Sequence, residues 1–395
     1  MRSVAIVGGG IGGLTAALAF ARTGAEVFVF ERADAFGEVG AGIQITPNAG
    51  RVLRALGVWD RLAARGVISD AVVPVDGLSG RSVARFDLSG QDPRYLFIPR
   101  PALIDVLAGA CRERGVALRT GMKVDMAEGR PALPGGEMPD ADLTVFADGL
   151  HSAGRAVLNG PSSPFFTGQV AWRAVVEGDM PSEARICMGP GRHVVLYPIG
   201  AGRINVVAVE ERADWAAEGW HYRDDPRNLR NSFRGFSSEV RAVLGRAEEV
   251  HLWGLFRHDI AETWGQGDLA LVGDAAHPTL PFLAQGANLA IEDAWVLAST
   301  LARGGSLADY GAARRPRVRR AIAAANANAR NYHLSGIART AALTALTAMG
   351  KVAPNAFLSR LSWLYDHDVT AGQGQLAPAW DVTRSSTSSD TKSTR

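Results

Sequence analysis

Three glycines and one glutamate near the start of the chain have the types and spacing of a dinucleotide-binding site. Gly8, Gly10 and Gly13 fit the pattern G-x-G-x-x-G, and Glu31 follows at about the ~20-residue distance typical of that motif. In the pattern, the first glycine makes a tight turn, the second lets backbone amides approach a pyrophosphate, and the third lets helix and strand pack closely. A terminal carboxylate can accept hydrogen bonds from both ribose hydroxyls, which favours FAD or NAD over NADP here.

The elements around these residues are those that such a site requires. The run "VAIV" predicts a strand, Ile11 to Thr23 an alanine-rich helix, and "EVFVFE" a second strand, so the first thirty residues form a βαβ unit. The amino terminus of the helix supplies partial positive charge to the phosphates. Arg32, directly after Glu31, is expected on the adenine side of the ligand.

A second segment with the pattern of a ligand-binding site lies far along the chain. In "GDLALVGDAAHPTLPFLAQGANLAIEDAWVLASTL", a strand from Leu269 to Val272 runs into Gly273 and Asp274, whose carboxylate can accept from ribityl hydroxyls. A simple NAD dehydrogenase has no need of this element, whereas FAD is longer and does. The helix that follows offers free first-turn amides to the pyrimidine edge of an isoalloxazine, namely those of Gly286, Ala287 and Asn288.

Length and composition exclude several classes of protein. The chain has 395 residues, 47% hydrophobic and 21% charged, enough for a large core and for two interlocked domains. The net charge of +2, with no long basic run, argues against a nucleic-acid partner. No membrane span and no metal site are predicted. Cys111 and Cys187 lie too far apart for a CxxC pair, which fits a reducing cytoplasm.

Three motifs together resemble those of the single-component FAD-dependent aromatic hydroxylases, the class A flavoprotein monooxygenases. They are "GGGIGG" with "FER", "ADLTVFADGLHS" and "GDAAHPTLPFLAQGANLAIEDA", and the resemblance covers Met1 to about Asp366. The stretch "GAGIQITPNAGRVLRALGVWD" is similar to hydroxylases of salicylate, 3-hydroxybenzoate and 6-hydroxynicotinate. The resemblance implies an α/β fold. In it, a Rossmann-like FAD-binding domain of the glutathione reductase type interleaves with a β-sheet substrate domain, and helices follow at the carboxyl-terminal end.

The resemblance also implies further cofactor residues. Asp148 and Gly149, after the strand "DLTVFA", are expected near both FAD and the incoming nicotinamide, and Arg100 near the ribityl-phosphate region. Taken alone, a strand ending in Asp-Gly is also an ordinary turn, and Arg100 before Pro101 an ordinary helix start. Since no second G-x-G-x-x-G occurs, NADH or NADPH must visit transiently, and the choice between them stays open.

The remaining segments are expected to build the substrate domain and the carboxyl-terminal helices. Roughly alternating strands in 163–210, with further strands in 71–97, predict a mixed or antiparallel sheet. The segment 309–351 reads as one long helix whose arginines, 314, 315, 317, 319 and 320, form a solvated face paired with carboxylates. The expected division is an FAD-binding domain of 1–70, 98–162 and 266–370, a sheet domain of 71–97 and 163–265, and a disordered tail of 376–395.

His193 is the candidate catalytic base. In the resembled family a flavin 4a-hydroperoxide transfers oxygen to an electron-rich ring, so the protein must exclude water and favour a phenolate. A base of near-neutral pKa serves this purpose, and His193 shares one face of a predicted strand with Tyr197. Related hydroxylases have a similar His-x-x-x-Tyr-Pro. The alternative is a histidine bonded within the sheet, and His151 and His277 are expected to be structural.

Three residues are expected in the substrate pocket. Pro281 and Phe282 predict an apolar wall, which favours a benzenoid or larger phenolic substrate over a pyridine, and Arg173 either binds a carboxylate or has a structural partner. The expected partners are a small aromatic substrate and dioxygen, with a monomer or homodimer as the assembly. The substrate's identity, the carbon attacked and any accompanying decarboxylation stay open.

Other functions share parts of these motifs. A flavin halogenase is expected to carry a Trp-x-Trp-x-Ile-Pro signature, which is absent. A related flavoprotein oxidase or reductase, or an epoxidase of a secondary-metabolite pathway, is the main alternative. A non-enzymatic flavin-binding regulator would keep all three motifs, and the absence of NAD(P)H turnover would reveal it.

Overall fold

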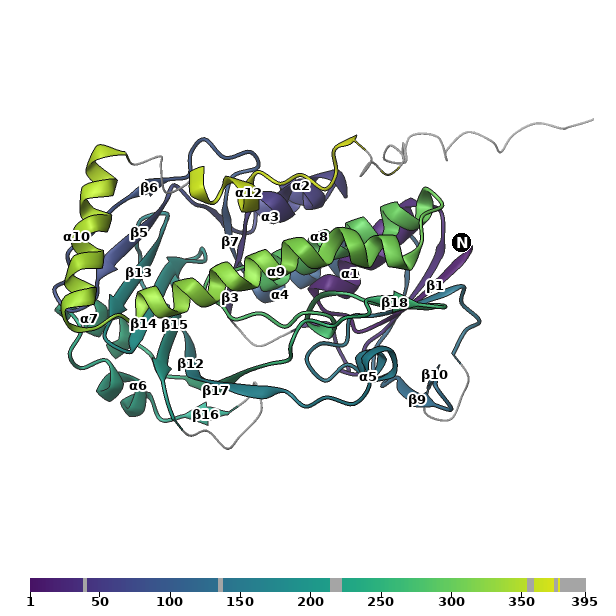
Figure 1. The fold of residues 1–395 in the computed structure, drawn as a ribbon, viewed down its shortest axis with the longest axis horizontal. Coiled ribbons are helices and arrows are strands. Elements are labelled where there is room, and N and C mark those ends of the chain that lie inside the picture. Colours follow the sequence, from purple (N-terminus) through teal and green to yellow (C-terminus); the bar gives the residue numbers. More distant parts are fainter. Residues whose placement is uncertain (38–40, 134–137, 214–221, 354–358, 373–375, 377–395) are drawn as a thin grey trace, which may run out of the picture.

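Two β-sheets stand at opposite ends of the protein, and long helices run between them (Figure 1). The computed structural model describes residues 1–37, 41–133, 138–213, 222–353, 359–372 and 376. The tail predicted for 376–395 therefore lies, beyond Leu376, outside the described residues. Among the described helices, none is long and apolar enough to cross a membrane.

The first sheet is mainly parallel and carries the dinucleotide fingerprint. Its strand order is β18-β19-β11-β1-β2-β8, with all neighbours parallel except β18 and β19. The strands are short apolar runs because both faces of a parallel sheet are covered. Helix α1 (Ile11–Arg22) packs against α4 (Arg100–Glu113) and α8 (Gly286–Ala302). The strands are β1 Ser3–Val7, β2 Glu26–Phe30, β8 Ala117–Arg119, β11 Leu143–Phe146, β18 Gly265–Gln266 and β19 Leu269–Leu271.

The second sheet is mixed, and it draws strands from both segments in which strands were predicted. Its order is β16-β17-β12-β15-β14-β13-β5-β6, and only the β13–β5 pair is parallel. Trp172 and Phe233 join a separate apolar core between this sheet and helices α6 (Pro226–Ser232) and α7 (Ser238–Gly245). The strands are β5 Ala71–Asp76, β6 Phe86–Asp87, β12 Phe165–Glu177, β13 Glu183–Gly189, β14 Arg192–Pro198, β15 Arg203–Glu211, β16 Arg223–Asp224 and β17 Val250–Arg257.

The remaining strands and short helices lie outside the two large sheets. A three-stranded sheet has the order β3-β7-β4, and β9 pairs with β10 in a short hairpin. The strands of these two groups are β3 Gly42–Ile45, β4 Val67–Ile68, β7 Leu96–Pro99, β9 Asp125–Ala127 and β10 Arg130–Ala132. The short helices are α2 Pro47–Ala55, α3 Trp59–Ala63, α5 Ala153–Asn159 and α12 Ser362–Tyr365.

The single long helix predicted for 309–351 is wrong. The structure has two helices, α9 (Leu307–Tyr332) and α10 (Gly336–Val352), which run in different directions in Figure 1. Helix α9 ends at Tyr332 with His333 as its C-cap, and Gly336, where α10 begins, has a φ of +55°, which belongs to the left-handed region and separates the two helices. As a result α10 lies beside β5 and the edge strand β6 of the second sheet, where Leu343 packs with Val83 and Met188.

Candidate active site

The glycine turn before α1 leaves open space where a pyrophosphate would lie. A Cβ at Gly8, whose φ is +103°, would overlap the carbonyl of Ala147, and a Cβ at Gly13 would overlap the carbonyl of Gly8. A Cβ at Gly10 would meet nothing within 4 Å. Two of the three glycines are therefore required by the protein's own packing, while the third faces free volume at the amino terminus of α1.

Glu31 ends the second strand of the βαβ unit and is held in place by the backbone. Its carboxylate accepts hydrogen bonds from the amides of Gly9 at 2.7 Å and Ala33 at 2.8 Å. Each carboxylate oxygen has a further lone pair, so the predicted ribose contacts remain geometrically available. Arg32 is exposed next to it. Burial raises the pKa of Asp148, and the charge of Arg32 partly opposes that rise, which connects the two predicted cofactor segments.

Asp148 has a buried acceptor that the described protein does not satisfy. It follows β11, and its Oδ2 accepts the amide of Ala153 at the start of α5 at 2.9 Å. Its Oδ1 is buried and has no hydrogen-bond partner among the described residues. Burial raises the pKa of this carboxyl. Since buried polar atoms are nearly always bonded, Oδ1 fits a hydroxyl or amide donor of a bound cofactor. Gly149, with a φ of +82°, turns the chain directly after it.

Three more predicted cofactor residues lie at helix starts. Arg100 is the first residue of α4, and its amide donates to the carbonyl of Ala41 at 2.9 Å, which brings the helix start to β3. Gly273 has a φ of +64° in the 3₁₀ turn Gly273–Ala275 that carries Asp274. A Cβ at Gly273 would press to 2.9 Å on Ala290 of α8, so the turn lies directly against that helix.

Helix α8 begins at Gly286, and its N-cap residue Gln285 makes no side-chain capping bond to it. The first-turn amides, those of Gly286, Ala287 and Asn288, are therefore positioned as predicted at the start of the helix. The side chain of Asn288 has a role that the sequence did not reveal. It accepts the amide of Thr46 at 3.0 Å and donates to the carbonyl of Gln44 at 2.9 Å. The end of β3 is thereby fixed against the first turn of α8.

A buried ionic network anchors α8 to α9. Glu292 and Asp293 are fully buried, and Arg314 donates to them at 2.6 and 2.7 Å. Burial raises the pKa of Glu292, but Arg314 and Arg317 lower it to about 2. The expectation that the arginine cluster is solvated is wrong for Arg314, which is 1% exposed, and for Arg317, whose side chain is 8% exposed and bonds Glu292. It holds for Arg315, which pairs with Glu262 at the surface.

His277 belongs to the same network. Its Nε2 lies 2.5 Å from Asp293 Oδ2, which also accepts the amide of Gly273 at 3.2 Å. The imidazole stacks on Trp264 with ring centroids 5.0 Å apart. The histidine therefore holds the 273–275 turn beside α8. Two acidic residues in an otherwise apolar helix, with arginines three positions apart on the next, are the sequence signal for this network.

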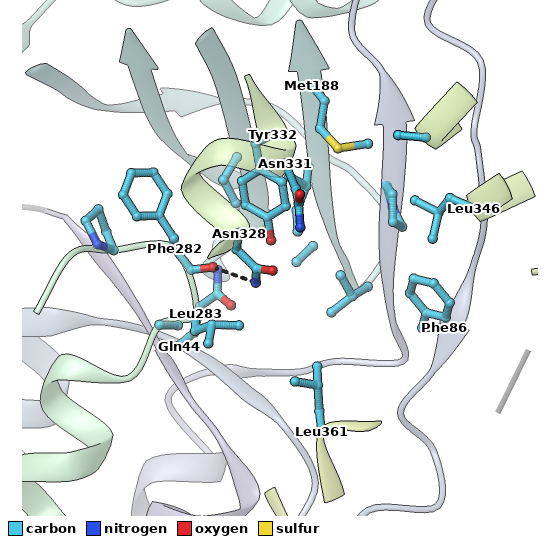
Figure 2. Close-up of a pocket in the computed structure, with 18 of the residues that line it drawn as sticks. Gln44, Phe86, Met188, Phe282, Leu283, Asn328, Asn331, Tyr332, Leu346 and Leu361 are labelled. Carbon is cyan, nitrogen blue, oxygen red and sulfur yellow. Dashed lines mark hydrogen bonds between the residues drawn. The ribbon is translucent and has the colours of Figure 1, made fainter. Parts of the chain in front are cut away.

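A cavity of about 320 Å³ lies between the second sheet, α9, α10 and the segment 281–284 (Figure 2). Its wall is mainly apolar, and Pro281 and Phe282 are part of it. Asn328 Nδ2 donates to the carbonyl of Phe282 at 3.5 Å, which joins α9 to that segment. Gln44 also lines the cavity, so one end of the cavity reaches β3 and the start of α8.

Arg339 of α10 is the charged residue of the cavity wall, among the residues that the structure describes there. It pairs with Asp76 at the end of β5, and both side chains are largely buried. The pocket arginine predicted from the sequence was Arg173, which is not among the described wall residues. The Arg173 guanidinium lies instead over the ring of Trp253, 4.7 Å from its centroid.

His193 is buried next to the cavity rather than exposed in it. Its ring lies 5.5 Å from that of Phe282 and 5.2 Å from that of Tyr332, both of which line the cavity. Its Nδ1 lies 2.8 Å from Nε2 of His333. Burial, and secondly His333, lower the pKa of His193 well below its ordinary value. The near-neutral pKa expected of this base is therefore not what the structure shows.

Tyr197 lies on the same strand, four residues beyond His193. Its ring packs against that of Phe97 with centroids 5.0 Å apart, and its hydroxyl is close to the side chains of Gln44 and Asn205. Burial raises the pKa of Tyr197, so it stays protonated at neutral pH. Gln44 connects it to the cavity.

Comparison with known proteins agrees with this arrangement. Residues 1–325 match the FAD binding domain family. The chain is 35% identical over 353 residues to the 3-amino-4-hydroxybenzoate 2-monooxygenase of Streptomyces platensis. The matched region covers 84% of this chain and 88% of the relative. The chain is 34% identical over 391 residues to the 3-hydroxybenzoate 6-hydroxylase of Klebsiella oxytoca, covering 92% and 96%. Klebsiella pneumoniae HpxO, solved with FAD and uric acid, superposes with a TM-score of 0.79 at 25% identity, covering 92% and 97%.

A parallel sheet with an open glycine turn, an unsatisfied buried carboxylate oxygen and a helix start without a side-chain cap fits a protein that binds FAD, and the relatives are FAD-dependent oxidoreductases. The chain belongs to the FAD binding domain family, as a flavoprotein monooxygenase of the aromatic hydroxylase type. The predicted fold class, family and FAD cofactor are confirmed.

Proposed function

We propose that this protein hydroxylates a phenolic, hydroxybenzoate-like compound, using NADH or NADPH and dioxygen as co-substrates. The observation that carries the proposal is the apolar cavity that reaches Gln44 beside the start of α8. Its volume of about 320 Å³ suits one substituted aromatic ring. Two relatives that span most of this chain are named for hydroxybenzoate substrates. Bound FAD would supply the activation of dioxygen with electrons from the nicotinamide.

The residues proposed to hold FAD follow the cofactor from end to end. Glu31 would accept from the ribose, and the open face of Gly10 would receive the pyrophosphate. Asp148 Oδ1 offers an unused acceptor, and Asp274 and Arg100 stand at neighbouring chain turns. The amides at the start of α8 would stabilise negative charge on the flavin ring.

The cavity wall would exclude water and orient the ring. Phe282, Leu283 and Tyr332 give it an apolar surface. Arg339 is the cation available to a carboxylate substituent, which fits a hydroxybenzoate-like substrate better than a neutral phenol. His193, whose ring lies behind that of Phe282, is proposed as the base for the phenolic proton, and Tyr197 lies four residues further along the same strand.

A substrate screen tests the proposed function directly. Purified protein should be yellow and hold one FAD per chain non-covalently. Monohydroxybenzoates, 3-amino-4-hydroxybenzoate and larger phenols are then tested with NADH and NADPH for stimulated nicotinamide oxidation, and products are identified by mass. A product that has gained one oxygen supports the proposal, and loss of carbon dioxide would show decarboxylation. Folded protein that takes up no FAD, or that oxidises NAD(P)H with no aromatic product, contradicts it.

Domain organisation, location and assembly complete the proposal. We propose that 1–70, 98–162 and 266–370 act as the FAD-binding unit and that 71–97 and 163–265 act as the substrate unit. The first sheet draws its strands from residues 3–271 and the second from residues 71–257, so the two units interlock. Both cysteines are buried thiols, which suits a reducing cytoplasm, where NAD(P)H is regenerated. Light scattering would distinguish a monomer from a homodimer.

A further inference from the structure

One face of helix α10 closes the substrate cavity. Four of its residues line the cavity at the spacing i, i+3, i+4 and i+7, which places them on the same side of an α-helix. They are Arg339, Ala342, Leu343 and Leu346. Leu343 is the one buried residue of α10, whose residues Gly336–Val352 the structure describes in full. The helix therefore contacts the rest of the protein mainly through the face that lines the cavity.

The second sheet forms the wall opposite α10, and the alternation along its strands makes that wall apolar. In β5, Val72 and Pro74 line the cavity, whereas Val73 between them lies in the core on the other face of the sheet. Phe86 of β6, which pairs with Val72, also lines the cavity. The neighbouring strand β13 presents alternate residues to the cavity in the same way, namely Ala184, Ile186 and Met188.

The cavity has two ends that differ in their surroundings (Figure 2). Gln44 and Leu283 lie at one end, next to the helix start proposed to face the flavin. Phe86 and Leu346 lie at the opposite end. We call this opposite region the apolar end and define it by Val72, Pro74, Phe86, Ile186, Leu343 and Leu346. None of the residues proposed to hold FAD belongs to β5, β6, β13 or α10, so the apolar end is separate from the proposed FAD site.

The cavity is larger than one aromatic ring requires. An apolar cavity of about 150 Å³ is enough to bind benzene in another protein, whereas the volume of this cavity is about 320 Å³. A hydroxyl and a carboxylate add little volume to a ring, so a simple hydroxybenzoate would leave much of the apolar end unfilled. Because protein interiors leave few voids larger than a water molecule, this space indicates a ligand that fills it.

The cavity face of α10 separates a charged position from an apolar one. Arg339 and Leu346 are seven residues apart, which corresponds to about 10 Å along the helix axis. This span is longer than a single benzene ring, so a ring whose carboxylate binds Arg339 does not by itself extend to Leu346. The space between Leu346 and Phe86 is instead suited to a hydrocarbon group carried by that ring.

Resting on the proposed function, we propose that the substrate is a hydroxybenzoate-like phenol that carries an apolar substituent of roughly the size of a second ring. The phenolic ring lies toward the segment 281–284, its carboxylate faces Arg339, and the substituent occupies the apolar end. Burial of the substituent supplies affinity that a simple hydroxybenzoate lacks, since each buried CH₂ group improves the dissociation constant by about fourfold. Leu346 and Phe86 therefore determine which substituents the enzyme accepts.

Pairs of ligands that differ by one phenyl group test this substrate class. Salicylate, 3-hydroxybenzoate and 4-hydroxybenzoate are each compared with derivatives that carry a phenyl group at one of the free ring positions. Dissociation constants are measured by calorimetry on oxidised, FAD-loaded enzyme without NAD(P)H. For at least one pair we expect the phenyl derivative to bind about tenfold more tightly or better. In Leu346→Trp, whose larger side chain fills the apolar end, the two members of that pair should bind equally.

Two further variants establish where the substituent lies. Val72→Phe fills the apolar end from the sheet and should also remove the preference, so the result does not depend on Leu346→Trp alone. Ala345→Trp places a tryptophan on the exposed side of α10 and should keep the preference of the parent. Thermal unfolding without ligand checks that each variant is folded.

The outcomes distinguish the substrate class from the proposed function. If the parent binds simple hydroxybenzoates but no phenyl derivative more tightly, the substrate class is wrong and hydroxylation of a hydroxybenzoate stands. A preference that persists in both filled variants also overturns the substrate class, as does its loss in Ala345→Trp. If neither member of any pair binds, the proposed function fails.

Toluene tests the apolar end without any phenolic group. It should raise the unfolding temperature of the FAD-loaded parent but not that of Leu346→Trp. Equal shifts in the two proteins, or no shift in the parent, would show that the apolar end does not take up a hydrocarbon.

Discussion

At the scale of single residues, His193 combines the position of a catalytic base with a pKa too low for one that stores its proton. It touches the rings of Phe282 and Tyr332 from behind the cavity wall and is bonded to His333. The sequence argument for a near-neutral histidine therefore identified a residue beside the cavity but not its electrostatic state.

Replacing His193 should uncouple nicotinamide oxidation from hydroxylation. We expect His193→Ala to retain FAD and to lower product formation by the ~10²–10⁴-fold typical of a lost general base. Hydrogen peroxide should replace the product. Raising the pH toward the substrate's own pKa should recover part of the activity, since solvent then supplies the phenolate. Product and peroxide are measured against NAD(P)H consumed.

The control for this variant is His251→Ala, on strand β17 of the same sheet, which should couple as the parent does. If His193→Ala still couples NAD(P)H oxidation tightly to product formation, the histidine only packs behind the cavity wall. Loss of thermal stability without uncoupling or pH rescue would point to the same conclusion.

Arg339 should select for a substrate that carries a carboxylate. The double variant Arg339→Met with Asp76→Asn removes the cation without leaving Asp76 buried and unpaired. We expect kcat/KM for hydroxybenzoates to fall by roughly tenfold or more, since a hydrogen bond to a charged group contributes about 1.5–3 kcal/mol. Phenols without a carboxylate should be unaffected. A uniform loss on both substrate groups would assign Arg339 a structural role.

At the scale of elements, α8 is anchored by buried ionic contacts in addition to the hydrogen bonds that Asn288 makes in its first turn. Arg314 of α9 reaches across to Glu292 and Asp293, and His277 carries the contact on to the 273–275 turn. The helix start proposed to face the flavin ring is therefore positioned by groups that lie deeper in the protein. Its stability should depend on those groups more than on any surface pair.

Two neighbouring arginines should show this difference. Arg314→Met removes the cation that two buried carboxylates share, leaving Glu292 with Arg317 and Asp293 with His277, and should cost about 3–5 kcal/mol of unfolding free energy. Arg315→Met breaks a surface pair with Glu262 and should cost no more than about 1 kcal/mol. Urea unfolding of both variants, each without FAD, measures the two values. Similar costs would contradict the inference that the network anchors α8.

The same carboxylates should make the fold sensitive to acid. The folded-state pKa of Glu292 is lowered to about 2, and that of Asp293 is also lowered. Their stabilisation is therefore fully present above the ordinary carboxyl pKa values of about 4, and it is lost as the pH falls toward about 2. Urea midpoints measured across this range should fall steeply for the parent and less steeply for Glu292→Gln. If the urea midpoints of the parent and of Glu292→Gln fall equally with pH, the ionised Glu292 does not contribute the expected stability.

At the scale of the whole molecule, FAD is expected to run from the first sheet to the cavity beside the second. Its proposed contacts come from chain segments between Gly8 and Asn288, so no short segment could bind it alone. Helices α8 and α9 extend between the sheets in Figure 1 and connect the two ends of this path. Cofactor binding and overall stability should therefore be separable by substitution.

Two glycines of the same turn provide that separation. Gly10→Val projects into open space, so the protein without FAD should keep its stability while FAD affinity falls by roughly tenfold or more, the loss of one charge-assisted hydrogen bond. Gly13→Ala overlaps the carbonyl of Gly8 and should destabilise the protein by about 1–3 kcal/mol even without FAD. Thermal unfolding and flavin-fluorescence titration distinguish them. Unchanged FAD affinity in Gly10→Val would remove this turn from the binding site.

The sequence by itself determined those features that depend on residue types at short spacing along the chain. The glycine pattern, the alternation of strand and helix, and the carboxylates at strand ends lie within short segments, and they predicted the fold class, the FAD cofactor and the family. The βαβ unit of residues 3–30 appears with nearly the expected boundaries. Such signals survive because a turn or a helix start requires particular residue types whatever packs around it.

Only the tertiary structure decided which distant residues meet. His193 and His333 are 140 positions apart, and their contact depends on where α9 ends and how its end packs on the second sheet. Arg314 looked like a surface residue because its helix is rich in arginine, yet the position of α8 buries it. The wall arginine is Arg339, not Arg173, because α10 turns back over β5. These outcomes depend on the relative placement of whole elements, which no local pattern of residues records.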